Sequence, residues 1–227
     1  MQIIPAILPK KFEEIKEKMA QVNGLIDVVQ IDLCDGRFVH TITWPFWQGN
    51  ERQFEKLANE EIAMPFWDTL DIEWDLMMKE PQDIIDNLIR IGAKRIIIHA
   101  SSVPDPIVIL EKLDSYTREN IEWGIAILPH KENVDTYKDA IEQYDFVQVM
   151  GMDTIGVQGS HLLETTYETI SAVRTLFPNK EISVDGGVSL QNAQNLFDAG
   201  ATRLVSGTGV FSSGDISQTI RTFNKIK

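Results

Sequence analysis

Hydrophobic and polar positions change their spacing repeatedly along the chain. Short apolar runs rich in β-branched residues alternate with stretches whose apolar residues recur at helical spacing. The short runs predict eight strands: Ile3–Leu8, Val28–Leu33, Leu70–Met77, Arg95–His99, Glu122–Ile127, Phe146–Met150, Glu181–Val184 and Arg203–Ser206.

The stretches that follow these runs predict one helix each. Ser189 is placed as an N-cap for one of them, and Gly92 and Gly200 stand where two helices should end. The expected helices are Lys11–Val22, about Glu51–Glu60, Pro81–Ile91, Asp105–Tyr116, Asn133–Gln143, Glu164–Phe177, Leu190–Ala199 and Asp215–Phe223.

Eight strand and helix pairs in strict alternation are typical of a closed parallel barrel. The apolar character of the strands suits such a barrel, because side chains cover each strand from within and helices cover it from outside. No linker rich in Pro, Gly or Ser and no low-complexity stretch interrupts the alternation. The sequence therefore predicts one domain over residues 1–227 with the (β/α)8 TIM-barrel fold of the α/β class.

The composition of the chain limits the kinds of molecule that the protein is expected to bind. The formal net charge is −13, so we expect neither nucleic acid nor an anionic membrane as a partner. The chain begins without a basic and then apolar signal segment, and Cys34 is its single cysteine, which excludes an internal disulfide. We expect a cytoplasmic protein in which any phosphorylated ligand is held by backbone dipoles.

Acidic residues lie at the ends of three predicted strands. Side chains alternate in a strand, so Gln30, Asp32 and Cys34 share one face, and Asp75 takes the matching position on the third strand. Asp185 ends the seventh strand. Because reactive groups of such barrels gather at the carboxyl ends of the strands, we expect the three aspartates to converge there. The alternative is that each aspartate caps a helix or pairs with a basic neighbour.

Glycines follow the last two strands. Gly186 and Gly187 come after the seventh strand, and Gly207 and Thr208 come after the eighth. The backbone N–H groups of loops at these two places often hold a phosphate in barrels of this kind. We expect these residues to bind the phosphate of a small phosphorylated sugar.

At this point the sequence resembles the ribulose-phosphate 3-epimerase family over nearly its whole length. The resemblance implies a carbohydrate-phosphate epimerase or isomerase of pentose phosphate metabolism, in which Asp32 and Asp185 transfer protons at the carbon next to a ketose carbonyl. The segments that carry it are Pro5–Leu8, Asp32–Val39, Asp75–Met77, Val184–Gly187 and Val205–Thr208.

The family holds a divalent metal between two histidines and two aspartates, and here both histidines are replaced. The resemblance places Gln30, Asp32, Asp75 and Asp185 at the metal positions. Oxygen donors alone favour Mg2+, Mn2+ or Ca2+ over zinc. Without a metal, three acids would repel one another, and a proton would be shared or a pKa raised.

Other family positions also differ. Ala6 replaces a serine, Cys34 a methionine and Arg37 a histidine. The segment Met150–Ser160 resembles the family's glycine-rich flap without its proline, which places Gly156 and Gly159 at the substrate. His99 ends the fourth strand and is expected either to form a hydrogen bond within the mouth or to have a structural role.

Two further functions stay open beside the epimerase. Loss of both histidines suits a non-catalytic descendant that binds a sugar phosphate as a sensor or scaffold. A decarboxylase or aldolase of the related ketogulonate- and hexulose-phosphate kind is less favoured, because its D-x-K-x-x-D motif is absent from the third strand. Three of the five tryptophans fall within residues 40–69, where they serve core packing, a lid or the contact of a homo-oligomer.

Overall fold

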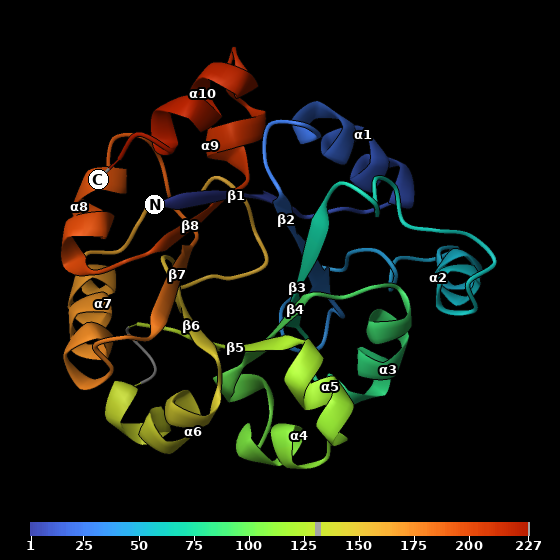
Figure 1. Ribbon diagram of the computed structural model, residues 1–227, viewed down its shortest axis with the longest axis horizontal. Helices are drawn as coiled ribbons and strands as arrows, with labels where there is room; N and C mark the ends of the chain where they lie inside the picture. Colours follow the sequence, from blue (N-terminus) through green and yellow to red (C-terminus); the bar gives the residue numbers. More distant parts are fainter. Residues whose placement is uncertain (130–132, 227) are drawn as a thin grey trace.

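The computed structural model describes residues 1–129 and 133–226 and contains the predicted closed barrel. Strands β1 to β8 follow one another around it in chain order, each is parallel to its neighbours, and β8 pairs with β1. Helices surround the strands, as Figure 1 shows. The carboxyl ends of all eight strands therefore open on the same end of the barrel.

The strand boundaries agree with the predicted ones to within one residue. The four strands β4, β5, β6 and β8 begin and end as predicted, because turn residues or polar residues bound their apolar runs. The strands are β1 (Gln2–Ile7), β2 (Val28–Cys34), β3 (Asp71–Met77), β4 (Arg95–His99), β5 (Glu122–Ile127), β6 (Phe146–Met150), β7 (Glu181–Asp185) and β8 (Arg203–Ser206).

The helices depart more from their predicted boundaries. The stretch Asp105–Tyr116 forms no single helix, because Asp114 has extended backbone and caps a new helix by accepting a hydrogen bond from the Thr117 N–H. The helices are α1 (Phe12–Val22), α2 (Glu51–Ala58), α3 (Gln82–Arg90), α4 (Ile107–Glu111), α5 (Ser115–Asn120), α6 (Lys138–Gln143), α7 (Thr165–Leu176), α8 (Ala193–Ala199), α9 (Thr208–Phe211) and α10 (Ile216–Phe223), with 3-10 turns η1 (Ala100–Ser102) and η2 (Val134–Tyr137).

The two ends of α8 illustrate one wrong and one correct prediction. Ser189 is not its N-cap: the helix begins later, and the Ser189 N–H instead donates to Oδ1 of Asn192. The Asn192 amide donates in turn to the Gly187 carbonyl, so these residues build the loop after β7. Gly200 ends the helix in the left-handed conformation, at φ 119°, as expected.

Charged side chains close the amino-terminal end of the barrel. Glu73 is fully buried; its carboxylate accepts a hydrogen bond from Arg203 at 2.6 Å and forms an ion pair with Nε of Arg95 at 3.0 Å. The Arg95 guanidinium lies 3.8 Å from the centre of the Phe146 ring. Paired charges and an aromatic ring therefore fill this end of the barrel interior, whereas the carboxyl ends of the strands form the opposite mouth.

The tryptophan-rich segment has two parts. Trp44 is fully buried and packs between the rings of Phe12, Phe54 and Trp74, which confirms core packing for this residue. Trp47 and Trp67 are exposed, and self-association through them stays a prediction. Among the described residues, no helix is both long and apolar enough to cross a membrane.

Candidate active site

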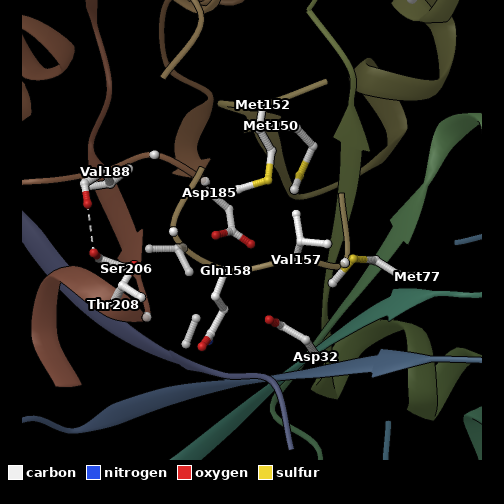
Figure 2. Close-up of a pocket in the computed structure, with 17 residues that line it drawn as sticks. Asp32, Met77, Met150, Met152, Val157, Gln158, Asp185, Val188, Ser206 and Thr208 are labelled. Carbon is white, nitrogen blue, oxygen red and sulfur yellow. Dashed lines mark hydrogen bonds between the residues drawn. The ribbon is translucent and has the colours of Figure 1, made fainter. Parts of the chain in front are cut away.

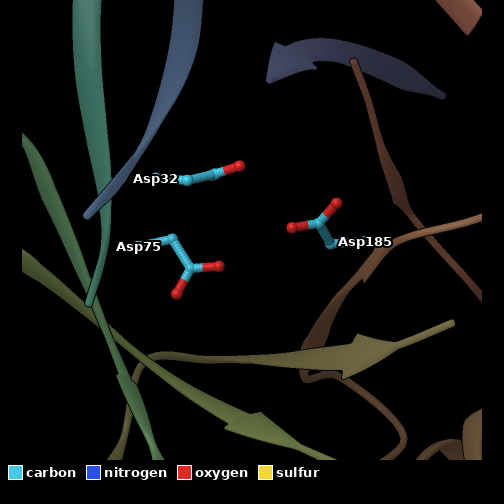
Figure 3. A group of neighbouring side chains, drawn as sticks. All are labelled: Asp32, Asp75 and Asp185. Atoms are coloured by element: carbon cyan, nitrogen blue, oxygen red, sulfur yellow. The ribbon is translucent and has the colours of Figure 1, made fainter. Parts of the chain in front are cut away.

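Three aspartates meet at the carboxyl end of the barrel, as their spacing predicted. Asp32 on β2 and Asp75 on β3 are paired in register, and Asp185 ends β7. Their side chains point toward one another in Figure 3, and one carboxylate oxygen from each lies within 4.8 Å of the other two. All three are buried. No salt bridge to Lys or Arg reaches them within the described ranges, so their carboxylates repel one another when ionised.

Gln30 links two of these acids across the barrel. Its Nε2 donates to Oδ1 of Asp32 at 2.8 Å and to Oδ2 of Asp185 at 2.9 Å. Its Oε1 is buried without a hydrogen-bond partner among the described residues. In this arrangement Gln30 faces the acids with its nitrogen, so its role as an oxygen ligand for a metal stays a prediction that requires the amide to turn over.

Asp75 is held by two partners. Nε2 of His99 is hydrogen-bonded to its Oδ1 at 2.9 Å, and Nε2 of Gln148 donates to its Oδ2 at 3.0 Å. The expected hydrogen bond of His99 within the mouth is thereby confirmed. Sequence reasoning missed Gln148, although a signal was present: it is the one polar residue of the apolar strand β6, on the same face as Met150.

The site shifts the proton affinity of two aspartates. Burial raises the pKa of Asp32 well above its ordinary range, and the charges of Asp185 and Asp75 add to this rise. Burial and the charge of Asp75 raise the pKa of Asp185 to about 7, against the opposing effect of the Gln30 hydrogen bond. A carboxyl group that titrates near neutral pH can give or take a proton under physiological conditions.

One cavity joins the acids to the glycine loops. Its empty volume of about 470 Å³ includes space that is open to solvent, and Figure 2 shows Asp32 and Asp185 facing it from different sides. All six positions predicted to bind substrate or phosphate line it, namely Gly156, Gly159, Gly186, Gly187, Gly207 and Thr208. The sulfur-bearing side chains of Met77, Met150 and Met152 lie along its wall.

The glycine loops leave no room for side chains where the cavity narrows. Gly187 has φ +67°, and a Cβ there would lie 2.4 Å from the Leu162 nitrogen. A Cβ on Gly207 would lie 2.6 Å from Nε2 of Gln158. Ser206 ties the loop after β8 to the loop after β7 by donating to the Val188 carbonyl at 2.9 Å. These loops therefore present backbone to the cavity, as a phosphate-binding loop must.

The arrangement of the acids fits a divalent cation. Three carboxylates offer hard oxygen donors at a spacing that one ion can bridge. Each hydrogen bond from Gln30 occupies one carboxylate oxygen, while Oδ2 of Asp32 and Oδ1 of Asp185 accept none within the part of the chain described. Asp32, Asp75 and Asp185 are the residues that would hold the ion.

Comparisons with known proteins agree with this geometry. Residues 2–211 match the model of the ribulose-phosphate 3 epimerase family. The chain is 29% identical to a ribulose-phosphate 3-epimerase of Candida glabrata, over 96% of this chain and 89% of that one. It is 26% identical to a ribulose-phosphate 3-epimerase of Bacillus subtilis, over 97% and 96% of the two chains.

Solved structures share the fold at lower identity. The 3-hexulose-6-phosphate synthase from Salmonella typhimurium superposes with a TM-score of 0.69 at 13% identity, covering 100% of this chain and 98% of that one. KGPDC from Streptococcus mutans, in complex with D-R5P, gives 0.69 at 14% identity, covering 98% and 94%. Fold, site and sequence lead to one conclusion: the chain belongs to the ribulose-phosphate 3-epimerase family.

Proposed function

We propose that the protein is a carbohydrate-phosphate epimerase that inverts the carbon next to a ketose carbonyl, with Asp32 and Asp185 as the proton-transfer pair. The observation that carries this proposal is the shared cavity, which both carboxylates and the backbone of two glycine loops face. A sugar whose phosphate lay against Gly186, Gly187 and Gly207 would extend toward the two acids.

Inversion needs two groups on different sides of the carbon. One ionised carboxylate removes the proton, and the second, protonated, delivers a proton to the opposite face. In the cation-free site the raised pKa values suit this division, because one of the two acids then keeps its proton near neutral pH. The hydrogen bonds from Gln30 hold the two carboxylates in place on either side of the cavity.

Removing the proton leaves negative charge on the carbonyl oxygen of the substrate. A divalent cation bound by Asp32, Asp75 and Asp185 would supply the positive charge that stabilises it. Burial of these residues and the apolar methionine wall keep water away from the reacting carbon.

The names of the relatives favour ribulose 5-phosphate as the substrate and pentose phosphate metabolism as the setting. The proposed partner is thus a small phosphorylated ketose. The proposed location remains the cytoplasm, in keeping with a single, buried cysteine.

Isotope exchange tests the proposal. Purified protein is incubated in D2O with pentulose and hexulose phosphates, with Mg2+, Mn2+ or Zn2+ or with EDTA, and deuterium at the carbon next to the carbonyl is measured. We expect incorporation, and we expect Asp32→Asn to lower its rate by about 10²–10⁴-fold. Asp86→Asn, which alters an exposed acid on α3, is the control. No exchange with any of the phosphates would refute the proposal.

A non-catalytic sugar-phosphate sensor is the second candidate, because both family metal histidines are absent while the glycine loops are intact. It predicts that a sugar phosphate raises the melting temperature, and equally so in Asp185→Asn, without any exchange. A melting temperature that none of the phosphosugars changes would count against it.

A further inference from the structure

Gln148 is a buried polar residue inside the barrel that the proposed proton transfer does not use. Its neighbours Val147 and Val149 face the helices and belong to the main core, whereas Phe146 and Met150 face the barrel interior. Gln148 lies between these two inward residues and is fully buried. An amide in such a place costs free energy unless its hydrogen-bonding groups are used.

Its hydrogen bonds lead to two acids on different strands. Nε2 donates to Oδ2 of Asp75 on β3 at 3.0 Å and makes a longer contact, 3.5 Å, with Oδ2 of Asp185 on β7. Gln148 therefore spans from β6 to β3 and to β7 and reaches both Asp75 and Asp185. Gln30 makes the corresponding link between Asp32 and Asp185. Two amides thus connect all three carboxylates.

We propose that Gln148 is a positioning residue that fixes Asp75 against Asp185 and thereby sets the affinity of the three-aspartate site for a divalent cation. The inference rests on the divalent cation of the proposed function, and it assigns a role to Gln148, which the proposed proton transfer does not use. Like charges at this spacing repel. Without the amide, Asp75 keeps His99 alone as a hydrogen-bond partner among the described residues and is free to turn away from Asp185.

The residue type suits this role. An amide is neutral, so it steadies the acids without competing for the site as a lysine or arginine would, and without adding to their charge as a glutamate would. Partners of this kind, which hold a metal ligand in place without touching the metal, typically contribute 10–100-fold to metal affinity.

The test measures binding of Mn2+ alone. In Gln148→Met the side chain has nearly the same shape but no hydrogen-bond donor. In Gln148→Asn the amide is kept on a shorter side chain. If one of the two variants does not fold, the other is used for the test. We expect Mn2+ to bind about 10–100-fold more weakly to each variant, by calorimetry and by the electron paramagnetic resonance signal of free Mn2+. In turnover assays we expect kcat to fall while KM for the sugar phosphate changes little, because the glycine loops are untouched.

The matched control is Thr169→Val on α7, which also removes a side-chain hydrogen bond, from Oγ1 to the Thr165 carbonyl, away from the site. It should leave Mn2+ affinity unchanged. Wild-type affinity in both Gln148 variants, or a wild-type protein that binds neither Mn2+ nor Mg2+, would overturn the inference. If wild type binds Mn2+ but exchanges no substrate proton, the proposed function fails and the role of Gln148 stands.

Discussion

The acid cluster should make the cation-free protein less stable as pH rises, and Asp185→Asn should remove much of that loss. Burial raises the pKa of Asp185 to about 7, against an ordinary value of 3.8. Below the ordinary value, both the folded and the unfolded chain hold the proton. Between the two values only the folded chain holds it, so stability falls as pH rises. Above about pH 7 both are ionised, and the full loss remains.

The size of the loss in stability follows from the width of the pH interval between the ordinary and the raised pKa of Asp185. It spans roughly three pH units at 1.36 kcal/mol each, which gives on the order of 4 kcal/mol. For a chain of this length, a change of that size corresponds to roughly 10 °C in melting temperature. Asparagine keeps the shape of the side chain and an oxygen that can accept from Gln30, so the substitution removes mainly the buried charge.

The assay is thermal unfolding in EDTA at about pH 8 and about pH 5. We expect Asp185→Asn to melt well above wild type at the higher pH and the difference to shrink by more than half at the lower pH. Asp86→Asn removes an equal charge from an exposed position and should change the melting temperature little at either pH. A variant no more stable than wild type at pH 8, or a difference that does not depend on pH, would refute the reasoning.

Three further outcomes are expected. Mn2+ at about one hundred times its dissociation constant should stabilise wild type by about 2.7 kcal/mol, and Asp75→Asn should abolish this; an unchanged gain in melting temperature would contradict the cation site. Gly187→Ala, at φ +67°, places a Cβ 2.4 Å from the Leu162 backbone nitrogen and should raise KM for the sugar phosphate about tenfold or more, whereas an unaltered KM would argue against a phosphate there. Glu73→Gln removes the buried carboxylate between Arg95 and Arg203, which keep Glu181 as an acidic partner, and should lower the free energy of unfolding by about 1.5–3 kcal/mol in urea titrations; an unchanged free energy of unfolding would contradict this.

Much of the fold is predictable from the sequence because each strand is a short apolar run. Its side chains point alternately into the barrel and toward the helices, so the position of a residue in the run predicts which way it faces. This alternation alone predicts that Asp32 and Asp75 face the barrel interior, and the order of the strands around the barrel brings Asp185 close to them. Helix starts were harder to predict, because a cap depends on local backbone geometry: Asp114 divides one expected helix, and Asn192 replaces Ser189 as the residue before α8.

The hydrogen bonds of the site could not be predicted in the same way. Gln30 and Asp185 are 155 residues apart, and the direction of the Gln30 amide depends on that distant carboxylate. The same holds for Gln148 and Asp75, 73 residues apart. The alternation of side chains along a strand indicates that such residues face inward. Their hydrogen-bond partners, however, depend on how the barrel closes, and the spacing of residues along the chain does not determine that.

Two-sided proton transfer is the central claim, and single-acid variants test it most directly. Ribulose 5-phosphate and its 3-epimer are each incubated in D2O with wild type, Asp32→Asn and Asp185→Asn, and inversion is measured separately from exchange. We predict that wild type inverts both substrates with deuterium uptake and that each variant loses inversion by about 10²-fold or more. Inversion at the wild-type rate in either variant would contradict the claim.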